Sequence, residues 1–376
     1  MKKVLIAITK GEIGGAQMFV RNLATGLKKD GLKITVILGS KHSDFLESEM
    51  TKAGIPIHTF YNLSRSFSPL RNFFLVLEAK RYLDKNLFDA IQLNSSNTLF
   101  IALAAKLSKS KPRVIFTHHG LSYLDPLSTK KIKRFFAGIV FKLLLPFVDL
   151  NVFVSQKNLD DALAMKLVKK ENSLVVYSGI NADFKSKIES LRFLESELDV
   201  SLKNKFILGS IGRLAYPKNY EFLIGAAPLL QAAYPELIFV IIGEGPDKPK
   251  YQKLIAKNNL ENYFYLAGEI KEAARYIKAF DLFVLPSIYE GSSLTAIEAI
   301  SAGLPVLISR VGGNPELVDG NNAQLFELDS QKEFTDKAMT IIRDKKLYQK
   351  LALQNKKISQ KFLEDFIVSQ YQKVLG

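Results

Sequence analysis

The feature that most constrains the fold of this chain is a repeated alternation of short apolar runs with longer amphipathic segments. The runs are rich in Val, Ile and Leu, as strands buried on both faces of a sheet are, and helical spacing fills the intervals, for example at 16–28 and 132–145. This rhythm predicts βαβ units and parallel sheets covered by helices. Strands are expected at residues 4–8, 34–38, 57–60, 90–93, 114–117, 150–154, 173–176, 206–211, 238–242, 263–266, 282–285, 306–308 and 324–326.

The rhythm also indicates two domains. It lapses between Asp183 and Lys205, in a polar stretch, and then restarts. A chain of 376 residues suits two α/β domains better than one. We therefore expect an N-terminal Rossmann-like domain at 1–185 and a C-terminal one at 186–360. Three helical stretches follow Asp329, more than a last crossover needs, and residues 361–376 are expected to return to the first domain.

Composition narrows the class of protein further. The chain has no Cys, which excludes disulfides, cysteine metal sites and a cysteine nucleophile, and which fits a reducing compartment. The first apolar run stops at Thr9 and has no small-residue cleavage site, so it is interpreted as a strand and not as a signal peptide. No run approaches the roughly 20 apolar residues of a membrane span. A cytoplasmic protein is expected.

Positive charge is concentrated in the N-terminal half. Residues 1–190 hold 29 of the 52 basic side chains but only 15 of the 37 acidic ones. One basic cluster runs directly into two aromatic residues, a pattern that suits an anionic membrane surface or nucleic acid; a solvated basic face is the plain alternative. The cluster consists of Lys130, Lys131, Lys133, Arg134, Phe135 and Phe136.

Open parallel sheets bind ligands beyond the carboxyl ends of their strands, and the informative residues of this chain lie there. Gly14 and Gly15 follow the first expected strand and open a helix, which favours a bound anion, although a simple tight turn explains them equally well. His118 and His119 follow another strand and precede Gly120. Either histidine could bind a sugar or phosphate, and a structural histidine is the alternative.

Arg213 and Lys218 follow the first strand of the second half. Two cations five residues apart at a strand end can hold a diphosphate, because Arg supplies a planar fork and Lys a point charge. Taken alone, they could equally be a surface pair.

The most informative segment runs from Pro286 to Glu298. A buried strand ends in proline, and a loop rich in Gly and Ser then opens a helix, so that backbone N–H groups and hydroxyls can bind phosphate and sugar oxygens. Glu290 lies on the loop and Glu298 about one turn into the helix. Two such carboxylates can accept hydrogen bonds from different hydroxyls of one extended ligand, whereas Glu298 alone would be an ordinary helix-dipole partner.

In this order the motifs resemble the retaining glycosyltransferases of family 4, over nearly the whole chain. The signature is the Glu-x7-Glu spacing of Glu290 and Glu298. The resemblance implies the GT-B fold, in which two Rossmann-like domains with parallel sheets face each other across a cleft. One departure is Ser178-Gly179-Ile180-Asn181, where family members often read Asn-Gly-Ile/Val-Asp. The other matching segments are Gly14-Gly15-Ala16-Gln17, Thr117-His118-His119-Gly120, Gly212-Arg213-Leu214 with Lys218, Gly243-Glu244-Gly245-Pro246 and Val311-Gly312-Gly313-Asn314-Pro315-Glu316.

The resemblance also implies roles. Arg213 and Lys218 would bind the donor diphosphate, Glu298 the ribose hydroxyls, Glu290 the donor sugar, and His119 the region near the reacting carbon. Together with Arg213, Lys218 and His119, Glu290 forms the expected catalytic set. The further donor-binding residues would be Gly14, Gly15, Gly243, Leu266, Gly268, Glu269, Gly291, Ser292, Ser293, Leu294 and Thr295.

We therefore expect an enzyme that moves a hexose or N-acetylhexosamine from a nucleotide diphosphate sugar to a glycan or lipid-linked acceptor. UDP is the favoured nucleotide, and GDP is the alternative. No Asp-x-Asp occurs in the chain, so no metal and no other cofactor is expected. The basic N-terminal domain would bind the acceptor, with peripheral attachment to the inner face of the cytoplasmic membrane. A nucleic-acid partner is not expected, because no RNA-binding aromatic signature accompanies the charge. A nucleotide-sugar epimerase and an inert nucleotide-sugar-binding protein are the alternatives.

Overall fold

The computed structural model describes residues 1–39, 44–66, 68–121 and 131–375, apart from the side chains of Asp44 and Lys133. Contacts divide the chain into two compact units. One unit comprises Met1–Ile180 together with Glu364–Gly376, and the other comprises Asn181–Leu363.

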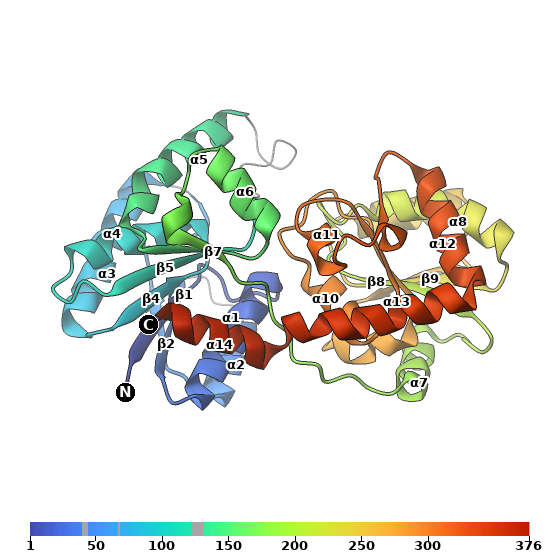
Figure 1. The fold of residues 1–376 in the computed structure, drawn as a ribbon, viewed down its shortest axis with the longest axis horizontal. Coiled ribbons are helices and arrows are strands. Elements are labelled where there is room, and N and C mark those ends of the chain that lie inside the picture. The colour runs from blue at the N-terminus through green and yellow to red at the C-terminus, as the bar shows by residue number, and fades with distance from the viewer. Residues whose placement is uncertain (40–43, 67, 122–130, 376) are drawn as a thin grey trace. The chain divides into compact units, whose positions relative to one another are not determined.

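The N-terminal unit is built on a sheet of seven parallel strands in the order β3-β2-β1-β4-β5-β6-β7 (Figure 1). Crossover helices connect the strands, because parallel neighbours cannot be joined by a tight turn. The strands are β1 (Lys3–Ala7), β2 (Lys33–Gly39), β3 (Ile57–Phe60), β4 (Ala90–Leu93), β5 (Arg113–His118), β6 (Leu150–Phe153) and β7 (Ser173–Val175).

Helices cover both faces of this sheet. One apolar core contains side chains of α1, α2 and the C-terminal helix α14, and another contains side chains of α3, α4 and α5. The C-terminal helix therefore belongs to the core of the first unit. The helices are α1 (Gly15–Lys29), α2 (Asp44–Lys52), α3 (Pro69–Lys85), α4 (Leu99–Leu107), α5 (Lys131–Leu144), α6 (Gln156–Ala164) and α14 (Glu364–Leu375).

The C-terminal unit has a sheet of six parallel strands in the order β10-β9-β8-β11-β12-β13. One apolar core packs α8, α9, α12 and α13 against this sheet. The strands are β8 (Phe206–Ile211), β9 (Leu237–Ile242), β10 (Phe264–Gly268), β11 (Leu282–Leu285), β12 (Val306–Ser309) and β13 (Leu325–Phe326). The helices are α7 (Lys187–Leu198), α8 (Tyr220–Ala233), α9 (Lys248–Lys257), α10 (Leu294–Ser301), α11 (Asn314–Leu317), α12 (Gln331–Arg343) and α13 (Lys345–Ile358).

The predicted fold class is confirmed. All thirteen expected strands are present, every neighbouring pair is parallel, and no strand end differs from its expected position by more than two residues. Among the described residues, no helix combines the length and the apolar character needed to cross a membrane.

The packing of α14 on α1 depends on a glycine (Figure 1). A Cβ added at Gly26, in α1, would lie 2.4 Å from Cγ2 of Val368 in α14. Because valine is rigid, Val368 is in the core and Gly26 is buried, the two helices can approach this closely only without a side chain at position 26.

The same substitution at two helical glycines should therefore have opposite effects. We expect Gly26→Ala to lower the free energy of unfolding by about 1–3 kcal/mol through overpacking. Gly138→Ala should raise it by up to about 1 kcal/mol, because nothing lies within 4 Å of a Cβ at Gly138 and alanine favours the helix. Urea unfolding measures both values. A Gly26→Ala variant as stable as Gly138→Ala would contradict this packing.

Candidate active site

The predicted residues of the C-terminal unit gather at the carboxyl edge of its sheet. The loop after β8 carries Arg213, which is exposed, and Lys218, which is partly buried. Hydrogen bonds from the N–H of Gly212 to the carbonyl of Ile242, 2.9 Å, and from Leu214 to Glu244, 2.9 Å, join this loop to the one after β9. The two loops therefore form one continuous surface.

Gly243 makes this close approach possible. Its φ is +149°, and a Cβ there would lie 2.1 Å from the carbonyl oxygen of Gly212. The N–H of Gly243 also donates to the carbonyl of Gly268 over 2.7 Å, which brings the end of β10 alongside. Leu266 and Gly268 are partly buried there, and Glu269 is exposed. Six of the predicted residues thus lie at the carboxyl ends of three adjacent strands, β8, β9 and β10.

An ion pair joins the loop after β8 to the loop after β11. The Nζ atom of Lys218 lies 2.8 Å from Oε1 of Glu290, and the two side chains are only 18% and 12% exposed. The hydroxyl of Ser287 donates to the same oxygen over 2.6 Å. Among the described residues no hydrogen bond to Oε2 of Glu290 is found, so this oxygen can accept one from a ligand.

Backbone hydrogen bonds from neighbouring loops also hold the loop that carries Glu290. The N–H of Gly313 donates to the Glu290 carbonyl over 3.3 Å, and the N–H of Ile288 donates to the carbonyl of Pro217 over 2.8 Å. Gly312 has φ +50°, and a Cβ there would lie 1.8 Å from the Glu290 carbonyl oxygen. The loop after β12 can therefore contact Glu290 only with glycine at this position.

Helix α10 begins directly after the loop that carries Glu290. Ser293 caps it by accepting a hydrogen bond from the N–H of Ala296 over 3.4 Å, while Leu294 and Thr295 form its partly buried first turn. The hydroxyl of Ser292 is buried and has no hydrogen-bond partner within the described part of the chain. Gly291 is buried, and Glu298 is partly buried one turn into the helix. An anion here would meet a helix N-terminus and a hydroxyl without a partner.

In the N-terminal unit, His118 ends β5 and His119 follows it. Nε2 of His119 lies 3.0 Å from Oδ1 of Asn94, and Nε2 of His118 lies 3.0 Å from Oδ1 of Asn151. Burial lowers the pKa of His118 to about 4, although the Asn151 hydrogen bond opposes the shift. Burial, together with the charge of His118, lowers the pKa of His119 to about 3. Both rings are therefore neutral at physiological pH.

Gly14 and Gly15 lie at the start of α1, where Gly14 is the cap residue. The same helix carries Phe19, whose ring meets that of His119 edge-on with centroids 4.8 Å apart. The glycine turn and the histidine are therefore connected through one helix.

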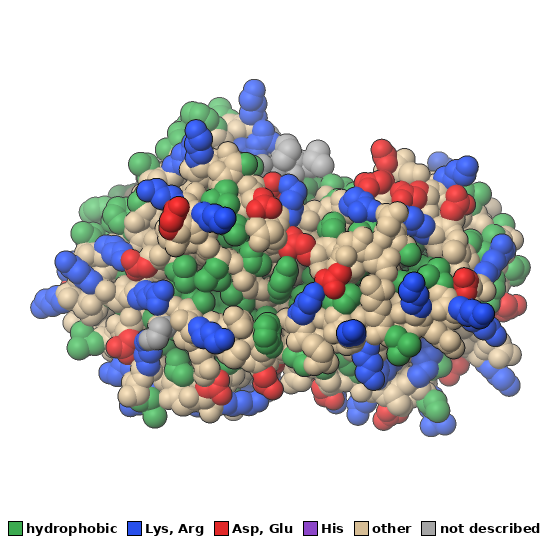
Figure 2. Space-filling model, in the orientation of Figure 1, with side chains coloured by type: hydrophobic (Ala, Val, Ile, Leu, Met, Phe, Trp, Pro, Cys, Tyr) green, Lys and Arg blue, Asp and Glu red, His purple; other side chains and the backbone are tan. Residues whose placement is uncertain are grey.

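The basic–aromatic cluster falls on α5 and forms part of a longer stripe. Ile132, Phe135, Phe136, Ile139 and Leu143 are 67%, 65%, 58%, 39% and 65% exposed. Their spacing places them on one side of the helix. Lys131 is exposed and Arg134 is partly buried, whereas Lys130 and the side chain of Lys133 lie outside the described residues. Hydrophobic and basic side chains gather together over α5 (Figure 2).

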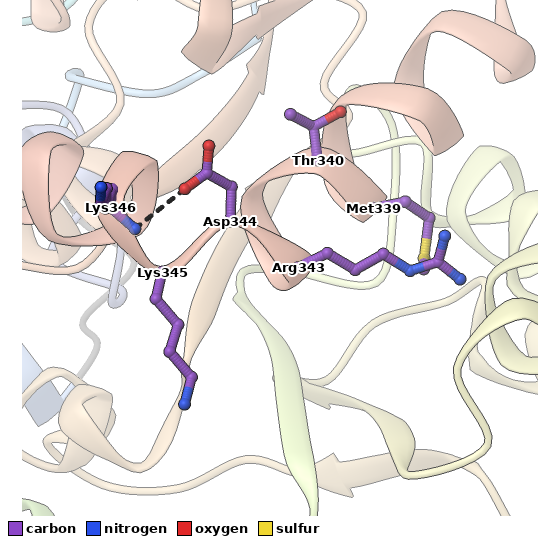
Figure 3. A pocket seen from close by; sticks show the side chains of 6 residues that line it. All are labelled: Met339, Thr340, Arg343, Asp344, Lys345 and Lys346. Atoms are coloured by element: carbon purple, nitrogen blue, oxygen red, sulfur yellow. Dashed lines mark hydrogen bonds between the residues drawn. The ribbon is translucent and has the colours of Figure 1, made fainter.

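A hollow at the junction of α12 and α13 contains none of the predicted residues (Figure 3). Asp344 lies beside it and caps α13 by accepting hydrogen bonds from the N–H groups of Lys346, 2.9 Å, and Leu347, 3.0 Å. This carboxylate already has a structural role.

Sequence reasoning missed the polar residues that support the histidine. Gln92 and Asn94 are buried in and just after β4, and Gln92 interrupts an otherwise apolar strand, which was a visible signal. Ser287, which donates to Glu290, lies within the segment from Pro286 to Glu298, but the sequence alone predicts no role for it. Among the described residues, no group of three or more His, Asp or Glu side chains is arranged to hold a metal ion.

The family model described as Glycosyltransferase Family 4 matches residues 13–184, and the one described as Glycosyl transferases group 1 matches residues 195–358. Together with the two parallel α/β units, these two matches identify the chain as a glycosyltransferase of the GT-B fold. The chain belongs to glycosyltransferase family 4.

Similar proteins are found among curated sequences and solved structures. One is the UDP-Gal:alpha-D-GlcNAc-diphosphoundecaprenol alpha-1,3-galactosyltransferase of Escherichia coli, 27% identical over 81% of this chain and 78% of that protein. Another is the N-acetylgalactosamine-N,N'-diacetylbacillosaminyl-diphospho-undecaprenol 4-alpha-N-acetylgalactosaminyltransferase of Campylobacter jejuni, 29% identical over 92% of each chain. The crystal structure of Anabaena HepE with UDP and glucose has a TM-score of 0.83, with 21% identity over 100% of this chain and 99% of that one.

The neutral histidines predict a pH-dependent stability. Unfolded histidine takes up a proton near pH 6.5, whereas folded His118 and His119 do so only near pH 4 and 3. Between these pH values the unfolded chain binds more protons than the folded one. The free energy of unfolding should therefore fall as the pH drops below 6.5, by up to about 1.4 kcal/mol per pH unit for each ring.

Urea unfolding at pH 7, 6 and 5 checks this expectation. The double variant His118→Asn/His119→Asn should show a shallower loss than the wild type between pH 6.5 and 5. If the free energy of unfolding falls equally steeply with pH in both proteins, the folded rings take up protons at the same pH as unfolded histidine, which would contradict the expectation.

Proposed function

We propose that this glycosyltransferase moves a hexose or N-acetylhexosamine from a nucleotide diphosphate sugar to a glycan or lipid-linked acceptor, with retention of configuration and without a metal ion. The observation that carries the proposal is the Lys218–Glu290 pair at the carboxyl edge of β8 and β11, beside the N-terminus of α10. It combines a cation for a diphosphate with a carboxylate for sugar hydroxyls.

Charge supports a diphosphate ligand at this edge. Arg213 is exposed there, Lys218 is fixed by Glu290, and α10 adds its positive end together with the unpartnered Ser292 hydroxyl. These groups can stabilise the charge that develops on a departing diphosphate, which a metal ion would otherwise do. Without an Asp-x-Asp in the chain, we assign this role to Arg213 and Lys218.

The carboxylates have separate tasks in this proposal. Glu290 has one oxygen bound by Lys218 and Ser287, so its other oxygen accepts a hydrogen bond from a donor-sugar hydroxyl. Glu298, one turn into α10, accepts hydrogen bonds from the ribose. We place the base near Gly243 and Leu266–Glu269, and we propose an ion-pair-like transition state in which the departing diphosphate helps to deprotonate the acceptor.

UDP is the nucleotide that we favour, and a lipid-linked sugar is the favoured acceptor. The Escherichia coli and Campylobacter jejuni relatives have acceptors named as undecaprenol-linked sugars, and the similar Anabaena structure contains UDP. The stripe of α5, with its basic neighbours, supports peripheral attachment to an anionic membrane that holds such an acceptor.

Thermal unfolding tests the donor site. With EDTA present and ligand at about 100 times its dissociation constant, one nucleotide series among UDP, GDP, ADP and their sugar conjugates should raise the melting temperature by about 5–10 °C. The shift should be lost in Glu298→Ala, because the ribose loses its acceptor. Glu197→Ala, which removes an exposed carboxylate of α7, is the control and should retain it.

Two outcomes would contradict the donor site: no nucleotide sugar shifts melting at millimolar concentration, or Glu298→Ala responds as the wild type does. Binding without turnover would favour an inert sugar-nucleotide-binding protein. Isomerised sugar released without an acceptor would favour the epimerase.

Sedimentation with anionic liposomes tests the α5 stripe. Phe135→Ser/Phe136→Ser should bind several-fold less than the wild type, because the stripe loses its two aromatic side chains. Replacing Lys130, Lys131, Lys133 and Arg134 with Gln should remove the dependence on anionic lipid. Leu353→Ser, on α13, removes a side chain that is 70% exposed and should change nothing. Unchanged binding in both α5 variants would exclude attachment through this helix.

A further inference from the structure

The C-terminal helix α14 brings a buried tyrosine to β5, the strand directly before the candidate catalytic histidine His119. Tyr371 is fully buried, and its hydroxyl lies 2.8 Å from Oγ1 of Thr117, two residues before His119. The two partners are 254 residues apart in the sequence. Burial raises the pKa of the Tyr371 phenol, so its hydroxyl stays neutral and can donate as well as accept.

From Thr117 a line of hydrogen bonds continues to His119. Nε2 of Gln92 donates to Oγ1 of Thr117 over 2.8 Å and to Oδ1 of Asn94 over 2.9 Å. Oδ1 of Asn94 lies 3.0 Å from Nε2 of His119. Gln92, Asn94 and Thr117 are each at most 3% exposed, so water does not compete for these bonds.

The carbonyl of Ala7 and the amide of Gln92 together orient the amide of Asn94. The carbonyl of Ala7 can only accept, and Nδ2 of Asn94 donates to it over 3.3 Å. Oδ1 of Asn94 therefore faces both Gln92 and His119. Because an amide oxygen cannot donate, Nε2 of His119 must carry the proton. The ring is neutral, so Nδ1 is left with its lone pair.

Aromatic contacts also connect α1 and α14 with His119. The ring of Phe19 meets His119 edge-on at 4.8 Å and Tyr371 edge-on at 5.5 Å. A shift of α14 would therefore alter the packing around the histidine as well as the hydrogen bonds to Thr117.

We propose that Tyr371 is a positioning residue for His119. Through Thr117, Gln92 and Asn94, it holds the imidazole as the tautomer protonated at Nε2, and Nδ1 then accepts a hydrogen bond from a substrate hydroxyl. The proposal rests on the proposed function and on the family resemblance, which implies that His119 contacts the donor sugar near its reacting carbon. It gives the last helix of the chain a part in catalysis as well as in folding.

The test is the tautomer of His119 in the free protein, read from the ¹⁵N shifts of labelled histidine side chains at pH 7 and assigned with His119→Gln. The wild type should show a protonated Nε2 and an unprotonated Nδ1. Tyr371→Phe keeps the ring but removes the hydroxyl, and it should shift both nitrogens toward a mixture of tautomers. Tyr348→Phe, which removes a partly buried hydroxyl that donates to Asp281 in the other unit, is the control and should leave the shifts unchanged.

Kinetics supply a second readout. Tyr371→Phe should lower kcat on the order of tenfold with little change in the donor KM, because the histidine is misplaced while donor binding through Glu298 is intact. If Tyr371→Phe does not fold, Thr117→Val removes the same link from the other side and should give the same mixture of tautomers.

A single Nε2-protonated tautomer in both Tyr371→Phe and Thr117→Val would overturn the proposal. The tautomer is measured without any substrate, so it is independent of turnover. If Tyr371→Phe loses the single tautomer and the wild-type protein transfers no sugar, the positioning role is supported and the proposed function is refuted.

Discussion

The ion pair between Lys218 and Glu290 is the contact on which the candidate site depends. It joins the loop after β8 to the loop after β11, two neighbouring strands of the same sheet, and it is mostly shielded from solvent. A partly buried charge is tolerated only with a partner, so each side chain fixes the other. Gly243 and Gly312 then let the loops after β9 and β12 close in on either side. The edge of the sheet is thereby organised before any ligand arrives.

The candidate residues of the N-terminal unit are held by hydrogen bonds between uncharged side chains, whereas those of the C-terminal unit are held by an ion pair. His119 is kept uncharged by burial and is oriented by Asn94, which is itself fixed by the backbone and by Gln92. A neutral imidazole can donate a hydrogen bond through one ring nitrogen and accept one through the other. Two different electrostatic environments are thus built at the carboxyl edges of two similar sheets.

The strands could be predicted from the sequence because those of a covered parallel sheet are short, apolar and bounded by loops. The gathering of candidate residues could also be predicted, since parallel strands place their carboxyl ends on one edge. Contacts between distant residues could not: nothing in the sequence pairs Lys218 with Glu290, 72 residues away, or Thr117 with Tyr371. Such pairs depend on how α14 and the loops pack, and periodicity carries no information about that.

The central claim is that sugar is transferred with retention from a nucleotide donor bound at the Lys218–Glu290 edge. It is tested most directly by proton NMR of the slow hydrolysis of the donor in the absence of an acceptor, which shows the anomer that is released first. The account predicts that the first sugar has the same anomeric configuration as in the donor, and that Lys218→Gln releases none above background. Release of the opposite anomer first, or unchanged release by Lys218→Gln, would contradict it.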